Sequence, residues 1–275
     1  MNKKILLIND LAGYGKVALS AMIPVLSHLK YELFSLPTAV VSNTLDYGKF
    51  EILDTTEYME KTIEVWKDLG FHFDAISTGF IINEKQVELI TSLTKEAKKQ
   101  NTLILSDPIM GDNGHLYNGV NESTVKLMKQ LIKNADYIVP NYTEACYLTN
   151  IPYRKEGLSI EESKLIIDKL RENGSKNIII TSVIFHHENH RSVIGYDSQN
   201  ETYFKLDYEE IPVSFPGTGD IFSAVLLGEI IKNNDLQKAT LKAMNVVKKM
   251  ISLNIDNVDK YKGIPVENYL EVIDE

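Results

Sequence analysis

The sequence has a single cysteine, Cys146, among its 275 residues. One thiol cannot form an internal disulfide, and this fits a reducing compartment.

Long apolar runs are also missing. The longest mainly apolar stretch, around residues 221–227, is far shorter than the roughly 20 residues that cross a bilayer, and residues 1–4 lead directly into a strand-like segment. We therefore expect a protein that is neither exported nor embedded in a membrane, with the cytoplasm as its compartment.

Positive charge is the next scarce feature. The chain carries 29 Lys and Arg against 38 Asp and Glu, a formal net charge of -9. A nucleic-acid-binding surface needs clustered basic residues to neutralise phosphates, so this composition argues against a nucleic-acid partner. An anionic ligand must instead be held locally, by backbone N–H groups or by a bound cation.

The composition that is present, 44% hydrophobic and 24% charged, is that of an ordinary globular protein. Strand-like and helical patterns alternate from residue 3 to residue 181, which predicts an α/β fold with a mostly parallel sheet and helices on both faces. The segments 178–185, 192–196 and 202–206 read as antiparallel strands at one edge of the sheet. Two helices, 221–231 and 236–251, follow. We expect one domain over residues 1–275, with ligands at the carboxyl ends of the strands.

Residues 216–220 (Pro-Gly-Thr-Gly-Asp) precede a helix that is apolar almost all round. Glycines permit a tight backbone, and the free N–H groups of a helix N-terminus attract an anion. The segment therefore predicts an anion hole with Asp220 at its mouth. The residues alone leave a second reading open, in which Asp220 is an acidic residue of the first helical turn, favoured only by the helix dipole.

Two earlier segments place carboxylates at the ends of consecutive predicted strands. Asp107 follows the strand 102–106, and Asn141 and Glu144 follow the strand 136–139. Mg²⁺ prefers oxygen ligands and keeps several waters, so Asp107 and Glu144 are candidates to hold it, directly or through water, against nucleotide phosphates. Taken singly, each is also compatible with a turn or capping role.

These segments together resemble the ribokinase-like superfamily. Gly217, Thr218, Gly219 and Asp220 match its Gly-x-Gly-Asp motif, while residues 107–108 and 141–144 match its Asp-Pro and Asn-x-x-Glu motifs. The resemblance implies an ATP-dependent kinase with Asp220 as the catalytic base and residues 217–219 as the anion hole. It also implies Mg²⁺ bound at Asp107 and Glu144, and ATP contacts at Asp107, Asp112, Asn141, Glu144 and Thr181.

The N-terminal third resembles the pyridoxal kinase branch of that superfamily. The matching segments are residues 13–15 (Gly-Tyr-Gly), 38–43 (Thr-Ala-Val-Val-Ser-Asn), 47–48 (Tyr-Gly) and 78–80 (Thr-Gly-Phe). By this resemblance the chain phosphorylates the hydroxymethyl group of a B6 vitamer, forms a homodimer, and lines its substrate pocket with Asp10, Thr38, Ser42, Tyr47 and Phe80. Many members carry Ser in place of Asp10 and Tyr in place of Phe80, which leaves the preferred vitamer open.

Three other functions are compatible with parts of the sequence. A hydroxymethylpyrimidine kinase shares the three motifs, but its acceptor loop usually has Gln before Asn, whereas Ser42 precedes Asn43 here. A kinase-like module that only binds ligand would lack turnover. A dinucleotide-dependent oxidoreductase would use residues 13–18 (Gly-x-Gly-x-x-Ala) with Glu32, a weak match that leaves Asp220 unexplained.

Residues 186–190 (His-His-Glu-Asn-His) suggest a metal site, but they lack the His-Glu-x-x-His spacing and fall in a predicted hairpin turn. We interpret them as an exposed polar turn.

Overall fold

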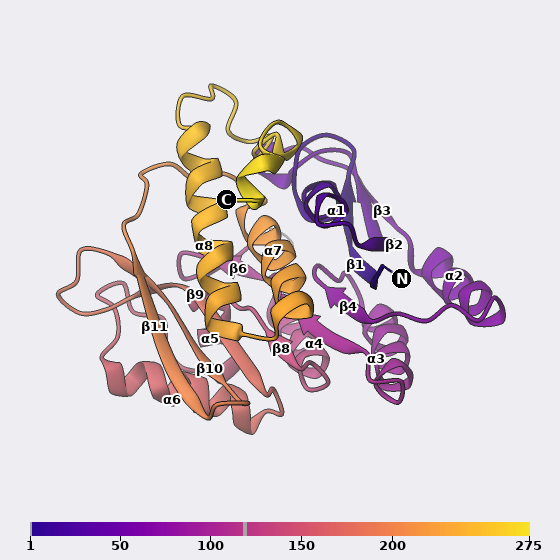
Figure 1. The fold of residues 1–275 in the computed structure, drawn as a ribbon, viewed down its shortest axis with the longest axis horizontal. Helices are drawn as coiled ribbons and strands as arrows, with labels where there is room; N and C mark the ends of the chain where they lie inside the picture. Colours follow the sequence, from indigo (N-terminus) through magenta and orange to yellow (C-terminus); the bar gives the residue numbers. More distant parts are fainter. Residues whose placement is uncertain (1, 118–119) are drawn as a thin grey trace.

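The computed structural model describes residues 2–117 and 120–275, and nine strands of this part join in one sheet (Figure 1). The strands are β1 (Lys4–Ala12), β2 (Glu32–Val41), β3 (Ile52–Asp54), β4 (Ala75–Thr78), β5 (Leu103–Ser106), β8 (Tyr137–Ile138), β9 (Asn177–Ile184), β10 (Arg191–Asp197) and β11 (Thr202–Tyr208). Their order in the sheet is β11-β10-β9-β8-β5-β4-β1-β2-β3. Because these strands share one sheet, we propose a single domain for residues 1–275.

The middle of the sheet is parallel and both edges are antiparallel. The pairs β1–β2, β1–β4, β4–β5, β5–β8 and β8–β9 are parallel. The predicted antiparallel edge is confirmed, because β10 pairs with both β9 and β11. The strand β3, antiparallel to β2, closes the opposite edge and was not predicted. Its three partly exposed residues are too few to show an alternating pattern.

The order of the strands reverses at β1, which determines where a ligand can bind. From β1 the chain moves to β2 on one side and then returns to β4 on the other, followed by β5, β8 and β9. Ligands of open α/β sheets bind in the crevice at the carboxyl ends of the strands where the direction of winding changes. The ends of β1 and β4 are therefore the expected centre of a functional site.

Helices cover both faces of the sheet. Side chains of α1 (Ala18–His28), α7 (Thr218–Asn233) and α8 (Leu236–Leu253) pack in one apolar cluster. The other cluster contains side chains of α2 (Thr56–Asp68), α3 (Glu84–Lys98), α4 (Glu122–Ile132), α5 (Tyr142–Thr149) and α6 (Ile160–Glu172). Alternate residues of β1 enter opposite clusters, Ile5 and Leu7 one of them and Leu6 and Ile8 the other, because neighbouring side chains of a strand point to opposite faces.

The smaller elements follow from local capping and turn chemistry. The helix α5 begins with Asn141 and Glu144 in a capping box. After β5, β6 (Gly111–Asp112) and β7 (His115–Leu116) form a short hairpin. The 3-10 helices η1 (Leu45–Tyr47), η2 (Val266–Asn268) and η3 (Leu270–Ile273) complete the described elements.

No helix of the described part combines the length and apolar character needed to cross a membrane.

The helix α7 lies between its neighbours α1 and α8, which explains its uniformly apolar sequence (Figure 1). Nearly all its residues from Asp220 to Gly228 are buried, including Leu226 at 0% exposure. A helix enclosed on all sides cannot shift without opening the core, so its N-terminal turn is held firmly in place.

Replacing Leu226 with Ala should therefore lower the free energy of unfolding by about 2–5 kcal/mol, because it removes buried methyl groups and leaves a cavity. Leu241 on α8, 45% exposed, provides the matched control, and Leu241→Ala should change the free energy by no more than about 0.5 kcal/mol. Urea unfolding measures both. Equal effects of the two substitutions would contradict the placement of α7 in the core.

Candidate active site

The N-terminal turn of α7 leaves its backbone N–H groups without a side-chain cap. The N-cap residue is Gly217, with φ +85°, and no side chain accepts a hydrogen bond there. A Cβ at this position would lie 2.0 Å from the Lys16 carbonyl oxygen, so only glycine fits. By contrast, a Cβ at the exposed Gly219 would meet no atom within 4 Å. The open space above Gly219 lies beside free N–H donors, which is the arrangement of an anion site.

Asp220 occupies the same turn, and both of its carboxylate oxygens accept hydrogen bonds. The Ala18 N–H, the first of α1, donates to Oδ2 at 2.7 Å. The Asn9 Nδ2 amide on β1 donates to Oδ1 at 3.3 Å. Asp220 thus joins α7 to the N-terminus of α1 and to the end of β1. The carboxylate has fixed donors on one side, and its remaining lone pairs are free to accept a proton from a ligand.

This contact also excludes the dinucleotide reading. In that fold the N-terminus of the first helix binds a pyrophosphate, but here Asp220 already accepts the Ala18 N–H. Glu32 starts β2 and pairs with Lys4, so it lies at the opposite end of β1 from the Gly13–Gly15 turn. An acidic residue there cannot contact a ribose bound at that turn.

Asp107 and Asp10 lie close enough to Asp220 to affect one another electrostatically. Ser223, one turn along α7, donates to Asp107 Oδ2 at 2.8 Å. Burial, and then the charge of Asp220, raises the pKa of Asp107 to about 8 and that of Asp10 to about 7. Burial raises the pKa of Asp220 itself to about 6, against the opposing effect of its two hydrogen-bond donors. Three carboxyl groups therefore share one poorly solvated space.

Glu144 has a structural role as well as a charge. Its Oε2 accepts the Asn141 N–H at 2.8 Å, closing the capping box of α5, and its Oε1 accepts the Met110 N–H at 2.9 Å. Burial, followed by the charge of Asp107, raises the pKa of Glu144 well above its usual value. With both oxygens bound to backbone donors, Glu144 is better suited to act through water than as a direct metal ligand.

Of the other residues predicted to contact ATP, two lie beside this cluster. Asn141 donates through Nδ2 to the Gly111 carbonyl at 2.7 Å and so holds the β6–β7 hairpin against α5. Thr181 on β9 pairs with Asn141 in an isolated parallel bridge. Asp112 is exposed on β6 and accepts a hydrogen bond from the Asn113 N–H at 2.7 Å. The hairpin thus borders the site from the side of β5.

The residues predicted to contact the vitamer fall into two groups. Thr38 is buried on β2 and donates to the Phe80 carbonyl at 2.8 Å, while the Phe80 N–H donates to Asn9 at 2.8 Å. Thr38 and Phe80 are therefore linked to Asn9, whose side-chain amide also donates to Asp220. Ser42 and Tyr47 are exposed and bond elsewhere: Ser42 accepts the Glu51 N–H at 2.9 Å, and the Tyr47 hydroxyl donates to Asp259 at 2.7 Å.

An aromatic cluster surrounds Tyr47. Its ring lies 6.1 Å from that of Tyr14 and 5.6 Å from that of Tyr261. The segment that bears Tyr261 is tied down by two hydrogen bonds, from Thr44 Oγ1 to the Tyr261 carbonyl at 2.6 Å and from the Lys16 N–H to the Lys262 carbonyl at 2.8 Å. The C-terminal segment therefore packs against the loop that bears Tyr47, which was predicted to line the substrate pocket, and against Lys16 next to the Gly-Tyr-Gly segment.

Two residues of the site were missed by the sequence reasoning. Asn9 holds Asp220, and Ser223 holds Asp107. A signal existed for Asn9, since it is a buried amide in a strand that is otherwise almost wholly apolar. Ser223 gave a similar signal as a hydroxyl within an apolar helix. Buried polar side chains usually have partners, so each was a candidate for a specific contact.

The carboxylate cluster fits a magnesium site. Asp107 and Glu144 offer only oxygen atoms, the ligand type that Mg²⁺ prefers, and burial, which raises the pKa of both, disfavours their charged forms. In the described ranges, 2–117 and 120–275, the one trio whose potential ligand atoms all lie within 4.8 Å of one another is elsewhere. Asp107 and Glu144 are not part of such a trio, and an ion held by them would need further ligands from water or phosphate.

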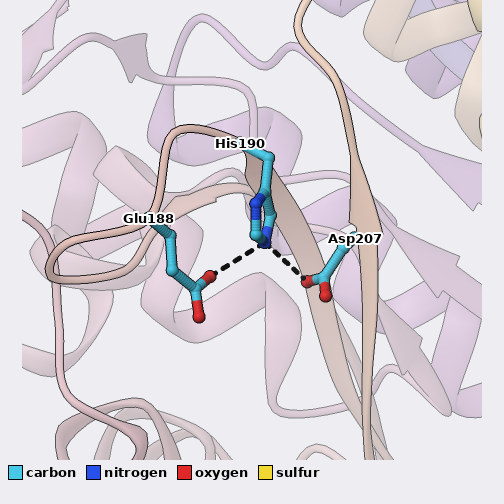
Figure 2. Close-up of side chains that lie close together, drawn as sticks. All are labelled: Glu188, His190 and Asp207. Carbon is cyan, nitrogen blue, oxygen red and sulfur yellow. Dashed lines mark ion pairs between the residues drawn. The ribbon is translucent and has the colours of Figure 1, made fainter.

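That other trio is Glu188, His190 and Asp207, which face one another across the β9–β10 turn and β11 (Figure 2). His190 Nε2 lies 3.0 Å from Glu188 Oε2 and 3.5 Å from Asp207 Oδ1. The Lys205 ammonium group already pairs with both carboxylates, at 2.9 and 2.6 Å. The Lys205 ammonium group therefore offsets part of the negative charge of this trio, and its interpretation as a polar turn stays a prediction.

An acidic residue at an uncapped helix N-terminus, beside the point where an α/β sheet reverses, is the arrangement of the ribokinase-like class of proteins. The phosphomethylpyrimidine kinase family model matches residues 20–265, and the chain belongs to this family of the ribokinase-like superfamily. The pyridoxal kinase of Dictyostelium discoideum is 30% identical over 96% of this chain and 90% of its own length.

Solved structures agree. A Bacteroides thetaiotaomicron protein assigned as a phosphomethylpyrimidine kinase and crystallised with pyridoxal is 36% identical, with a TM-score of 0.95, over 100% of this chain and 96% of its own. The pyridoxal kinase of Lactobacillus plantarum is 27% identical, with a TM-score of 0.86, over 98% of this chain and 96% of its own. These matches confirm the predicted ribokinase-like fold and its resemblance to pyridoxal kinases.

The raised pKa values predict how stability changes with pH when neither nucleotide nor metal is present. The carboxyl groups of Asp10, Asp107 and Asp220 titrate near pH 4 in the unfolded chain but at about 7, 8 and 6 in the folded protein. Between pH 4 and 8 the unfolded chain binds fewer protons, so the free energy of unfolding falls as pH rises, by about 1.4 kcal/mol per pH unit for each proton of difference.

Asp107→Asn should flatten this dependence between pH 6 and 8, because it removes one of the charges that must form in the buried site. Urea unfolding at several pH values measures the slope. A slope unchanged by the substitution would show that Asp107 does not carry the shifted titration.

Proposed function

We propose that this chain transfers the γ-phosphoryl group of ATP to the 5′-hydroxymethyl group of a B6 vitamer. The single observation that carries the proposal is the placement of Asp220 in the free N-terminal turn of α7, with both oxygens held by donors, in a chain similar to pyridoxal kinases over nearly its whole length. Phosphoryl transfer requires positioning, charge neutralisation and an oriented hydroxyl, and this turn offers N–H donors for the phosphoryl charge and a carboxylate that can orient the hydroxyl of the substrate.

In the proposed mechanism Asp220 accepts the proton of the vitamer hydroxyl as the hydroxyl oxygen attacks the γ-phosphorus. The bond from the γ-phosphorus to the bridging oxygen breaks, and ADP leaves. The backbone N–H groups of residues 217–219, which have no side-chain cap and lie next to the open space at Gly219, stabilise the charge on the transferring phosphoryl group. A pKa of about 6 leaves Asp220 mostly ionised at neutral pH, so it is ready to accept a proton.

Mg²⁺ is part of this proposal, held by Asp107 directly and by Glu144 through water. When bound, the ion neutralises phosphate charge during transfer. The carboxyl group of Asp107 has one oxygen bonded to Ser223, which orients the other toward the site. Asp112, Asn141 and Thr181 are proposed contacts of ATP, since they border the cluster on the side of β6 and β9.

The vitamer is proposed to bind between Asp10, Thr38 and Phe80, with Ser42 and Tyr47 at the rim. Asp10 is half-buried and close enough to Asp220 to influence it. As an anion it accepts a hydrogen bond from the ring hydroxyl, a protonated ring nitrogen or an amine, all of which B6 vitamers offer. Phe80 presents an apolar ring that is tied through its backbone to Thr38 and Asn9.

Hydroxymethylpyrimidine is a second candidate substrate. The family model is described by a pyrimidine substrate, yet the similar Bacteroides protein of that description was crystallised with pyridoxal. A panel of pyridoxal, pyridoxine, pyridoxamine and hydroxymethylpyrimidine, with ATP and Mg²⁺, discriminates the two. Turnover of the pyrimidine alone would replace the B6 assignment, and ligand binding without any turnover would favour a binding module.

Two further expectations complete the proposal. ATP as a substrate and one free cysteine fit the cytoplasm as the compartment. The similarity to pyridoxal kinases supports a homodimer, and sedimentation at micromolar concentration would distinguish it from a monomer.

Asp220→Asn should lower kcat for a B6 vitamer by on the order of 10² to 10⁴ while leaving ATP affinity nearly unchanged, because the amide keeps the shape but cannot accept the proton. Steady-state kinetics and calorimetric titration of nucleotide measure these two quantities. The matched control is Asp235→Asn, since Asp235 caps α8 by accepting the Lys238 N–H. If Asp220→Asn kept full kcat, Asp220 would not be the base.

Glu144→Gln should raise the Mg²⁺ concentration needed for half-maximal rate several-fold. Glutamine keeps one oxygen, which can accept the Asn141 N–H of the capping box, but its NH₂ group cannot accept the Met110 N–H, so the substitution removes the charge and one backbone hydrogen bond. Initial rates across a Mg²⁺ titration at fixed ATP measure the effect. An unchanged titration would show that Glu144 does not act on the metal.

A further inference from the structure

The orientation of the Asn9 side-chain amide is determined by its surroundings. Two backbone groups donate to its Oδ1, the Asp10 N–H at 3.0 Å and the Phe80 N–H at 2.8 Å. An amide nitrogen cannot accept these bonds, so the oxygen must face them and the NH₂ group must face the other way. That group lies 3.3 Å from Asp220 Oδ1 and 3.7 Å from Met22 Sδ. Asp220 therefore faces the NH₂ donor of Asn9 and not its carbonyl oxygen.

The same amide has no room to rotate. Asn9 is 3% exposed. A Cβ added at Gly79 would lie 2.5 Å from the Asn9 amide carbon, so the backbone at Gly79 packs directly against the Asn9 side chain. With the amide fixed from two directions, its N–H vector toward Asp220 is preorganised rather than formed on ligand binding.

We propose that Asn9 is a positioning residue for Asp220, which fixes the plane of the carboxylate and holds it as an anion that faces the acceptor hydroxyl. The Ala18 N–H constrains one oxygen and Asn9 the other, so the two bonds together prevent rotation of the carboxylate. Asp10 and Asp107 act in the opposite sense, since each interacts repulsively with the Asp220 charge. The donors of Asn9 and Ala18 offset that repulsion.

The position of Asn9 also links the base to the vitamer pocket. Phe80 donates its N–H to Asn9, and its carbonyl accepts the Thr38 hydroxyl. One buried amide thus sets the distance between the proposed base and the proposed ring contact. Because this inference rests on the proposed function, its effect should appear in the chemical step and not in the affinity for ATP. A misplacement of about 1 Å at a reacting group costs on the order of 10² in rate.

The isosteric substitution Asn9→Asp tests the proposal. It keeps an oxygen for both backbone donors and the same volume beside Gly79, but it places a carboxylate against Asp220 in place of an NH₂ donor. We expect kcat for the vitamer to fall by on the order of 10², with the KM for ATP unchanged within about twofold. Asn9→Ser, which adds no charge and is too short to reach Asp220, should give the same pattern if Asn9→Asp fails to fold.

Asn177 offers a matched control at the other end of the strands. It is buried, its Oδ1 accepts the Ser198 N–H at 2.9 Å, and its Nδ2 donates to the Asp136 carbonyl at 3.1 Å. Asn177→Asp makes the same chemical change away from the site. It should lower thermal stability without lowering kcat.

A double-mutant cycle separates positioning from a general structural effect. If Asn9 acts through Asp220, Asn9→Asp should change the residual rate of the Asp220→Asn enzyme by less than about threefold. An equal loss in both backgrounds, or an Asn9→Asp enzyme with full kcat, would overturn the proposal. The wild-type and Asp220→Asn rates on the substrate panel test the proposed function separately, and the cycle can be run on whichever substrate the wild type phosphorylates.

Discussion

The hydrogen bonds to the Asp220 carboxylate are the interactions on which the site depends. They join three parts of the chain that are distant in sequence: the end of β1 through Asn9, the start of α1 through Ala18, and the first turn of α7. Because α7 is enclosed by the core, its first turn cannot move to improve these bonds, so β1 and α1 must be placed to meet it. The reversal of strand order at β1 brings them there.

The electrostatic arrangement of the site follows from its burial. Carboxyl groups from β1, the residue after β5, α5 and α7 gather at one edge of the sheet. Burial raises the pKa of all four, and a neighbouring carboxylate adds to this effect for Asp10, Asp107 and Glu144. The described donors are backbone N–H groups, the Asn9 amide and the Ser223 hydroxyl, all uncharged. A cation that enters with the nucleotide would remove the remaining repulsion, so binding of substrate and completion of the site become one event.

The parts of the structure that sequence reasoning predicted are those encoded by local patterns. The helices expected at residues 221–231 and 236–251 are α7 and α8, and the antiparallel strands expected at 178–185, 192–196 and 202–206 are β9 to β11. Asp107, Asn141, Glu144 and Asp220 were proposed because turn chemistry at strand ends and at a helix N-terminus is visible over four or five residues. Their roles stay predictions, although the structure brings them together at one edge of the sheet.

The features that the sequence could not reveal are those created by contacts between distant segments. Tyr47 was predicted to line the pocket. Its observed partners, Tyr261 and Asp259, come from the C-terminal segment. The residues next to Tyr47 in the chain give no information about that segment. Asn9 illustrates the same limit more sharply. Its neighbour Asp10 attracted the functional reading because it is charged, whereas the amide at position 9 contacts the base. Which of the two side chains contacts Asp220 depends on which face of β1 is turned toward α7. Alternation along the strand places Asn9 and Asp10 on opposite faces, but it does not tell which helix covers each face.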